Sequence, residues 1–227
     1  MTTLVIAAHP DDEILGAGGY VAKLSAAGEA VHHVIMAEGA TSREDTRDRA
    51  GKSEELSELA RCAQEAGRIV GAKSVVLEDF PDNRMDSVDL LDVVKVVERH
   101  IAEHAPTRII THANSDVNID HRVVHDAVIA ATRPQPGNRI REVLFFEIMS
   151  STEWRPPASL PAFAPNYFVD ITDHLEAKLD ALRAYAPEMR EWPHSRSVEA
   201  LEHLGRWRGA TIGVEAAEAF ATGRIIA

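Results

Sequence analysis

The sequence predicts an α/β fold in which helices cover both faces of a mostly parallel sheet. Short apolar runs alternate with amphipathic stretches along the chain, as is typical of strands joined by crossover helices. The first run, residues 4–8, is continuously apolar, which indicates a strand buried on both faces. With 227 residues, 45% of them hydrophobic, the chain is long enough to bury one full core, so we expect a single Rossmann-like domain over residues 1–227.

The individual elements follow from local patterns. Strands are predicted over residues 4–8, 30–36, 74–77, 108–111, 141–146 and 167–170, and helices over residues 14–27, 54–71, 88–104 and 121–131. Prolines mark an irregular insertion at about 150–166, and a helical region is predicted at about 173–227. Asp173 and Glu176 are expected to form a capping pair at the start of that region.

Composition excludes several classes of function. The formal net charge of −12 argues against broad nucleic-acid binding, which needs a basic surface. No run approaches the roughly 18–20 apolar residues of a membrane span. The first residues lack the pattern of a signal peptide, and Cys62 is the only cysteine, so no internal disulfide can form. We expect a cytoplasmic protein.

A histidine and three acidic residues follow the first predicted strand directly, as His9-Pro10-Asp11-Asp12-Glu13. The carboxyl ends of strands are where open α/β sheets bind their ligands. Carboxylates this close together repel one another, so such a cluster usually requires a cation. The segment therefore predicts a metal site at one edge of the sheet.

A second polar segment, residues 111–121, occupies the same position after its own strand and before its own helix. We expect it to supply a third ligand besides His9 and Asp12. Neighbouring strand ends would bring the two segments together, although 109 residues separate Asp12 from His121 (121 − 12). Imidazole and carboxylate donors with an open position describe a catalytic zinc site, although such donors also accept Fe²⁺ or Co²⁺.

The two adjacent aspartates predict a division of roles. One would bind the metal, and the other would take a proton from the water that attacks a carbonyl. The residue types alone do not assign Asp11 and Asp12 to these two roles.

The block Ala-His-Pro-Asp-Asp-Glu at 8–13, with Asn-x-Asp-His at 118–121, resembles the LmbE/PIG-L family of zinc-dependent N-deacetylases, and the resemblance covers most of the chain. It implies that His9, Asp12 and His121 bind zinc and that Asp11 is the general base. It also implies an enzyme that removes acetyl groups from N-acetylglucosamine units of small conjugates, and a family that often assembles into homo-oligomers.

One position departs from the family pattern. Many members have a histidine that assists the transition state where this chain has Asn118. Asparagine can donate a hydrogen bond but not a proton near pH 7. Asn118 or His112 would then hold the oxyanion, with His112 and His125 as candidates for acid assistance. Asp120 is expected to orient a neighbouring group, as carboxylates often do for metal-bound histidines.

Three further residues are candidates for substrate binding. The Arg43 guanidinium could bind a sugar hydroxyl or a phosphate, and the alternative is an exposed arginine in a charged loop. Glu153 and Trp154 could line the pocket with the indole under a sugar ring, and the alternative is a buried anchor for the irregular segment. Arg196, Arg206 and Arg208 could reach a phosphate or a neighbouring subunit, but we expect them to form ordinary surface salt bridges.

These observations together predict a metal-dependent hydrolase that removes the N-acetyl group of an N-acetylglucosamine-type amino sugar, including nucleotide-linked ones. Two alternatives stay open. One is an amidase or esterase with a non-sugar substrate on the same scaffold. The other is a non-catalytic sugar-binding protein that keeps the metal for stability.

Overall fold

One sheet of seven strands organises the computed structural model, in the order β3-β2-β1-β4-β5-β7-β6. The structure describes residues 1–43, 45–159 and 161–227, without the side chain of Arg43. The strands are β1 (Thr2–Ala7), β2 (Ala30–Ala37), β3 (Ser74–Phe80), β4 (Arg108–His112), β5 (Glu142–Phe146), β6 (Tyr167–Asp170) and β7 (Ala217–Ile225). Strands β1 to β5 pair in parallel, and β7 runs antiparallel to both β5 and β6.

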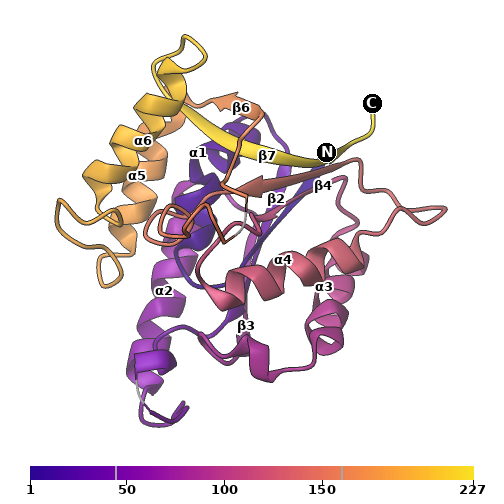
Figure 1. Cartoon of the computed structure of the whole chain (residues 1–227), viewed down its shortest axis with the longest axis vertical. Helices are drawn as coiled ribbons and strands as arrows, with labels where there is room; N and C mark the ends of the chain where they lie inside the picture. Colours follow the sequence, from indigo (N-terminus) through magenta and orange to yellow (C-terminus); the bar gives the residue numbers. More distant parts are fainter. Residues whose placement is uncertain (44, 160) are drawn as a thin grey trace.

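Helices cover the sheet on both faces (Figure 1). On one face lie α1 (Asp12–Ala26), α2 (Ser53–Ile69), α5 (Leu175–Ala184) and α6 (Val198–Ala210). On the other face lie α3 (Leu90–His104) and α4 (Ile119–Ala131). Short 3₁₀ turns, η1 (Thr41–Arg43), η2 (Met85–Ser87) and η3 (Thr172–His174), complete the connections.

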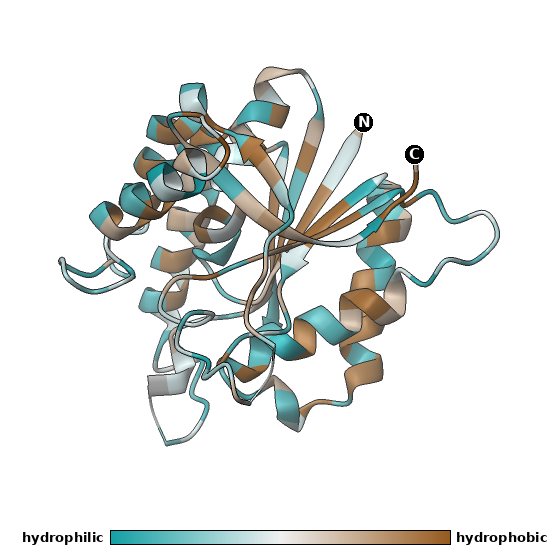
Figure 2. Cartoon of the chain, turned by 45° about the horizontal axis from the view of Figure 1, so that its top comes forward, coloured by the Kyte–Doolittle hydropathy of each residue, from teal (hydrophilic) through white to brown (hydrophobic). Residues whose placement is uncertain are grey.

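Burial on both faces of the sheet accounts for the continuous apolar runs in the sequence. Leu4, Val5 and Ile6 of β1 are fully buried, with Val5 in the core under α1 and the other two in the core under α3 and α4. Figure 2 shows the hydrophobic colour concentrated in the strands and the hydrophilic colour on the outer surfaces of the helices. Parallel strands covered on both sides are expected to look like this.

The amino-terminal half of α1 packs very closely on its neighbours. A Cβ atom at Gly16 would lie 2.4 Å from the Phe146 ring, and one at Gly19 would lie 2.6 Å from the Ile171 side chain. These glycines therefore serve close packing of the helix. Close packing therefore explains the glycine-rich start of α1.

Chain order reverses beside β1, and this reversal positions the functional site. The chain passes from β1 to β2 and β3 on one side, and then returns to place β4 on the other side of β1. The carboxyl ends of β1 and β4 therefore lie next to each other at a topological switch point, where open α/β sheets form their binding crevice.

The structure confirms the predicted α/β class and the first six strands to within a few residues, and it corrects the carboxyl-terminal region. The helical region expected at about 173–227 contains α5 and α6 but ends in strand β7. The expected capping pair is also wrong, because α5 begins after His174 with no side-chain cap and η3 contains Asp173. Among the described residues, no helix is both long and apolar enough to cross a membrane.

His33 of β2 generates a prediction about stability in acid. The side chain is fully buried, neither ring nitrogen has a hydrogen-bond partner among the described residues, and burial lowers the pKa of His33 to about 3 from 6.5. Between these two pH values the unfolded chain binds a proton at this ring and the folded chain does not, so folding stability falls as the pH drops through that window.

We therefore expect His33→Leu to lose less stability than the parent chain on acidification, by up to about 1.4 kcal/mol per pH unit within the window. Urea unfolding at neutral and at mildly acidic pH measures the difference. His203→Gln, at an exposed position of α6, is the control and should follow the parent chain. Parallel acid sensitivity in the parent chain and in His33→Leu would contradict the assignment.

Candidate active site

The turn after β1 places three polar side chains at the entrance to α1. Asp11 adopts a left-handed backbone conformation with φ of 105°, which non-glycine residues rarely adopt. Such a conformation costs on the order of 1–3 kcal/mol and is concentrated at functional sites. The turn is closed by the backbone N–H of Asp12, which donates to the His9 carbonyl at 3.2 Å.

The second arm of the site is the segment between β4 and α4. Asn118 is the N-cap of α4, and its side-chain oxygen accepts a hydrogen bond from the Asp120 N–H at 2.8 Å. This cap fixes where the helix begins, so Asp120 and His121 both fall in its first turn. Both side chains are buried beneath the turn that follows β1.

Three donor atoms from these two arms converge. Asp12 Oδ2 lies 3.3 Å from His9 Nδ1 and 3.2 Å from His121 Nε2, and the two ring nitrogens are 3.3 Å apart. A tetrahedral zinc ion with bonds of about 2.0–2.1 Å holds its ligand atoms about 3.3–3.4 Å apart. The triangle therefore has the size of one face of a zinc coordination sphere.

Other carboxylates lie beside the outer nitrogens of the same two rings. Asp120 Oδ2 lies 3.0 Å from His9 Nε2 and also accepts the backbone N–H of Asn83 at 2.6 Å. Asp116 Oδ2 lies 3.1 Å from His121 Nδ1. A carboxylate behind each metal-binding histidine is the usual arrangement in metal sites, because it orients the ring and makes the inner nitrogen a better donor.

The surroundings of these groups shift their pKa values in opposite directions. Burial alone would raise the pKa of Asp116, but contact with the His121 ring and hydroxyl donors lowers it to about 2. Burial alone would lower the pKa of His9, yet Asp12 and Asp120 raise it well above its usual value. Negative charge therefore dominates the pocket, as a cation site requires.

An unsatisfied acceptor supports the same conclusion. Oδ1 of Asp12 is buried without a hydrogen-bond partner among the described residues, as is Oδ1 of Asp11. Leaving buried carboxylate oxygens unpaired is costly unless a cation or water satisfies them. The residues present therefore fit a divalent metal ion.

A second grouping of donors overlaps the first. His9, Asp82 and Asp120 also offer ligand atoms close together, with His9 Nε2 3.4 Å from Asp82 Oδ1. In this grouping Asp120 already accepts backbone N–H groups from Asn83 and Met85. The grouping of His9, Asp12 and His121 supplies two imidazoles and leaves Asp120 as the supporting carboxylate, so we favour it.

Asp11 faces a cation from a distant part of the chain. Nη1 of Arg196 lies 3.1 Å from Asp11 Oδ2, while Nε of Arg196 donates to the Ser150 hydroxyl at 2.9 Å. The expectation of an ordinary surface salt bridge is therefore wrong for Arg196. It holds for Arg206, which pairs with Glu202 at 2.9 Å in an exposed position.

The environment of Asp11 suits proton transfer. Burial raises the pKa of Asp11 well above its usual value, and the charge of Arg196 acts in the opposite direction. A carboxylate with a raised pKa is a stronger base near neutral pH. Asp11 thus lies next in the chain to Asp12 without being one of the three candidate ligands.

A cavity of about 180 Å³ opens over this centre, and its wall is mostly polar. Its lining residues come from both arms and from the segments after β2 and β3: His9, Pro10, Gly39, Ala40, Ser42, Leu59, Asp82, Asn83, Asn118, Glu188 and Arg196. Asn118 donates from its amide to the Asn83 side chain at 2.8 Å. Such a wall offers many donors and acceptors to a hydroxyl-rich ligand.

His112 lies behind the centre and not in this cavity. Its ring is fully buried and stacks on His121 at 4.0 Å, and its Nε2 accepts the Ala8 N–H at 2.8 Å. Burial lowers the pKa of His112 well below its usual value. His112 is not among the residues that line the cavity, so any part it plays in the reaction would pass through its contacts with His121 and Ala8.

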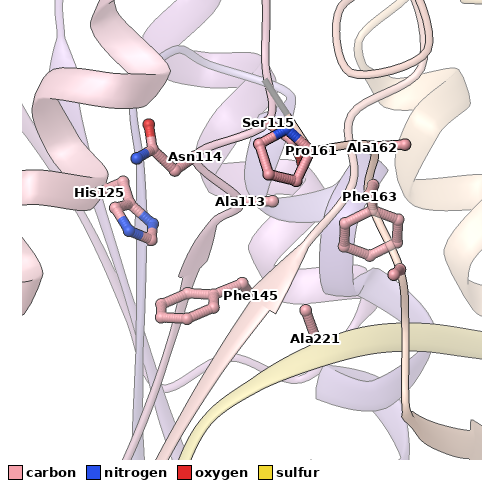
Figure 3. Close-up of a pocket in the computed structure, with 10 residues that line it drawn as sticks. Ala113, Asn114, Ser115, His125, Phe145, Pro161, Ala162, Phe163 and Ala221 are labelled. Carbon is pink, nitrogen blue, oxygen red and sulfur yellow. The ribbon is translucent and has the colours of Figure 1, made fainter. Parts of the chain in front are cut away.

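His125 lines a different cavity. Its Nδ1 bonds to the His112 carbonyl at 2.8 Å, and its ring packs on Phe145 at 4.6 Å. Figure 3 shows His125, Asn114, Phe145 and Phe163 around this space of about 340 Å³, which no residue of the metal triangle lines. His125 is therefore a packing residue with respect to the centre.

Two of the three candidate substrate-binding residues, Glu153 and Trp154, lie outside the lining of the cavity over the centre. The side chain of Arg43 falls outside the described part of the structure. Glu153 is exposed, and its carboxylate accepts the N–H groups of Ser150 and Ser151 at 2.7 and 3.2 Å. Trp154 is 54% exposed, so it is not a buried anchor, and it meets His194 edge-on at 5.8 Å.

The sequence-based predictions did not include three residues of this site, namely Asp116, Asp82 and Arg196. Asp116 lay within the polar segment of residues 111–121, but nothing marked it as the partner of His121. Asp82 lay in a second polar segment after a strand, which is a weak signal of the same kind as that of Asp11. Arg196 had no local signal, since 185 residues separate it from Asp11.

Fold and site together define an α/β protein with a candidate metal centre at the carboxyl edge of its sheet, and a buried carboxylate beside it. Comparison with known families identifies the family of this protein. The PIG-L family, described as GlcNAc-PI de-N-acetylase, matches residues 4–132. The chain belongs to this family. The matched range contains both arms of the site.

Individual relatives agree with this assignment. The chain is 26% identical over 195 residues to a probable N-acetyl-alpha-D-glucosaminyl L-malate deacetylase 2 from Bacillus cereus, covering 85% of this chain and 87% of the relative. It is 28% identical over 203 residues to the diacetylchitobiose deacetylase of Thermococcus kodakarensis, covering 83% of this chain and 70% of the relative.

The fold itself serves more than one chemistry. The crystal structure of a 4-carboxy-2-hydroxymuconate hydratase from Pseudomonas putida superposes with a TM-score of 0.77 at 22% identity, covering 100% of this chain and 97% of the other. Similarity of fold therefore does not define the reaction, and the residues of the site must do so.

The contact between Asp116 and His121 generates a prediction about metal affinity. Replacing Asp116 with asparagine keeps the shape of the side chain and removes the charge behind the ring. We expect Asp116→Asn to weaken zinc binding about 10–100-fold, because supporting carboxylates of this kind contribute that much. Competition with a chelator measures the affinity. Asp180→Asn, at an exposed position on α5, is the matched control and should bind zinc like the parent chain.

Proposed function

We propose that this chain hydrolyses the N-acetyl group of an N-acetylglucosamine-type amino sugar, using a divalent metal held by His9, Asp12 and His121. The main support for this proposal is that these three donors converge beside Asp11. Asp11 is a buried carboxylate that does not belong to the group of three. Family membership supports deacetylation, and the two relatives named above are described as deacetylases of amino-sugar conjugates.

The metal we propose is Zn²⁺, because the two imidazoles and one carboxylate match its preferred donors, although Fe²⁺ or Co²⁺ would also be accepted. When bound, such an ion supplies Lewis-acid polarisation of the acetamide carbonyl and makes water acidic enough to react near neutral pH.

The chain's own residues carry the proton transfers in this proposal. Asp11 accepts a proton from the attacking water while the water oxygen bonds to the carbonyl carbon, and the protonated carboxyl then returns a proton to the departing amine nitrogen as the C–N bond breaks. The products are acetate and the free amino sugar. Arg196 holds the Asp11 carboxylate in place for both transfers.

The polar wall of the cavity supports a sugar ligand. We propose that Asn83 and Asn118 hydrogen-bond to ring hydroxyls or to the acetamide oxygen, since both side chains line the cavity. Asp120 orients His9 in this scheme.

We also propose that the part of the conjugate beyond the sugar, including a nucleotide, contacts Arg43, Glu153 and Trp154. Assembly into a homo-oligomer is a further part of the proposal. A cytoplasmic location also remains part of the proposal.

Asp11→Asn separates metal binding from turnover. We expect the variant to hold metal like the parent chain and to lose about 10²–10⁴-fold in kcat, because the amide cannot accept the proton. Metal content and acetate release together test this. His121→Ala should lose both metal and activity, whereas Asp180→Asn should lose neither. Full turnover by Asp11→Asn would show that another group is the base.

A substrate panel tests the reaction class. Acetate release is measured with N-acetylglucosamine-malate, diacetylchitobiose, a nucleotide-linked N-acetylglucosamine, an O-acetyl ester and an N-acetyl amino acid. We expect turnover of one or more of the amino sugars and little of the last two. Preference for the ester or the amino acid would favour a non-sugar amidase or esterase. Absence of metal-dependent turnover on every substrate would favour a sugar-binding protein.

A further inference from the structure

A second cluster of histidines lies at the edge of the sheet opposite to the candidate active site. His100, Glu103 and His104 belong to the last turns of α3, and one ligand atom of each lies within 4.8 Å of the others. His32, near the start of β2, stacks on the His104 ring at 4.1 Å. The candidate active site occupies the carboxyl ends of the strands, so the two clusters are separate.

We propose that His100, Glu103 and His104 form a second metal site, specific for a divalent transition ion such as Zn²⁺, Co²⁺, Ni²⁺ or Cu²⁺. His100 and His104 are one helical turn apart and therefore project from the same face of α3. The sequence His-Ile-Ala-Glu-His has the His-x-x-Glu-His spacing by which helices present two imidazoles to zinc.

Ring nitrogens without a hydrogen-bond partner among the described residues support a bound ligand at this cluster. His100 is 2% exposed, and its Nδ1 is buried without a hydrogen-bond partner among the described residues. His104 Nε2 is in the same condition. Buried polar atoms are normally paired, so two unpaired ring nitrogens on one helix face indicate an unmet ligand.

Glu78 of β3 orients His100 in the way that carboxylates orient metal-binding histidines. Its Oε1 lies 2.8 Å from His100 Nε2. Donors around Glu78, including His100 and Arg99, lower its pKa against the effect of burial. An ionised Glu78 accepts the proton of Nε2, so the lone pair of His100 resides on Nδ1, the nitrogen without a partner.

The position of the cluster near the carboxyl end of α3 also favours binding of a cation. Glu103 and His104 lie in the last turn of the helix, where the helix dipole presents partial negative charge. Two imidazoles with one carboxylate prefer transition ions to Mg²⁺ or Ca²⁺, which favour oxygen ligands. Because Glu103 is exposed, we expect weaker binding here than at the active site.

The test counts bound zinc on the full chain after removal of metal with a chelator. Equilibrium dialysis at excess zinc is expected to give two equivalents per chain for the parent. His104→Gln and His121→Ala should each retain one equivalent, and the double variant should retain none. His203→Gln is the control for a general loss of histidine and should retain two. Circular dichroism establishes that each variant is folded.

A second measurement separates specific binding from loose association. In the His121→Ala background, zinc should raise the melting temperature, since an ion that binds only the folded state stabilises it. Glu103→Gln, a change at an exposed side chain, should reduce this shift, and His104→Gln should abolish it. One equivalent in the parent chain, or a second equivalent that persists in His104→Gln, would overturn the proposal. Neither result would bear on the proposed deacetylase reaction, which depends on His121.

Discussion

The carboxylate of Asp12 lies within 3.3 Å of ring nitrogens of both His9 and His121. The arrangement of the neighbouring side chains depends on this contact. Three ionisable groups this close are stable only where their charges compensate or where a cation joins them. The neighbouring contacts serve that requirement: Asp120 and Asp116 support the outer ring nitrogens, and the cap at Asn118 fixes the start of α4. The left-handed turn at Asp11 positions Asp12, the third candidate ligand, at the start of α1.

The contact also separates two carboxylates that are adjacent in the chain. Asp12 points at the two histidines, whereas Asp11 points at Arg196. Their surroundings move their pKa values apart, since burial raises that of Asp11, and the contacts with His121 and His9 lower that of Asp12 against the effect of burial. Such a pair of unlike carboxylates suits a site in which one group binds and the other transfers protons.

Much of the architecture could be predicted because local patterns and tertiary demands agree. Buried parallel strands must be apolar throughout, and the helices between them must be amphipathic, so both patterns are visible in the sequence. The prediction was wrong where they disagree. Strand β7, with the sequence Ala-Glu-Ala-Phe-Ala-Thr-Gly-Arg-Ile, has the composition of a helix, yet pairing with β5 and β6 makes it a strand. Pairing partners distant in the chain outweigh such weak propensities.

For the site, the sequence by itself determined the residue types and their two segments: His9 to Asp12 after one strand and Asn118 to His121 after another. Those choices are local, because a strand end followed by a helix start positions its own side chains. Only the tertiary structure decided which distant groups complete the site. It placed Arg196 against Asp11, gave Asp116 to His121 and buried His112 behind the centre. Contacts of this kind depend on how strands are ordered in the sheet, and no local pattern encodes that order.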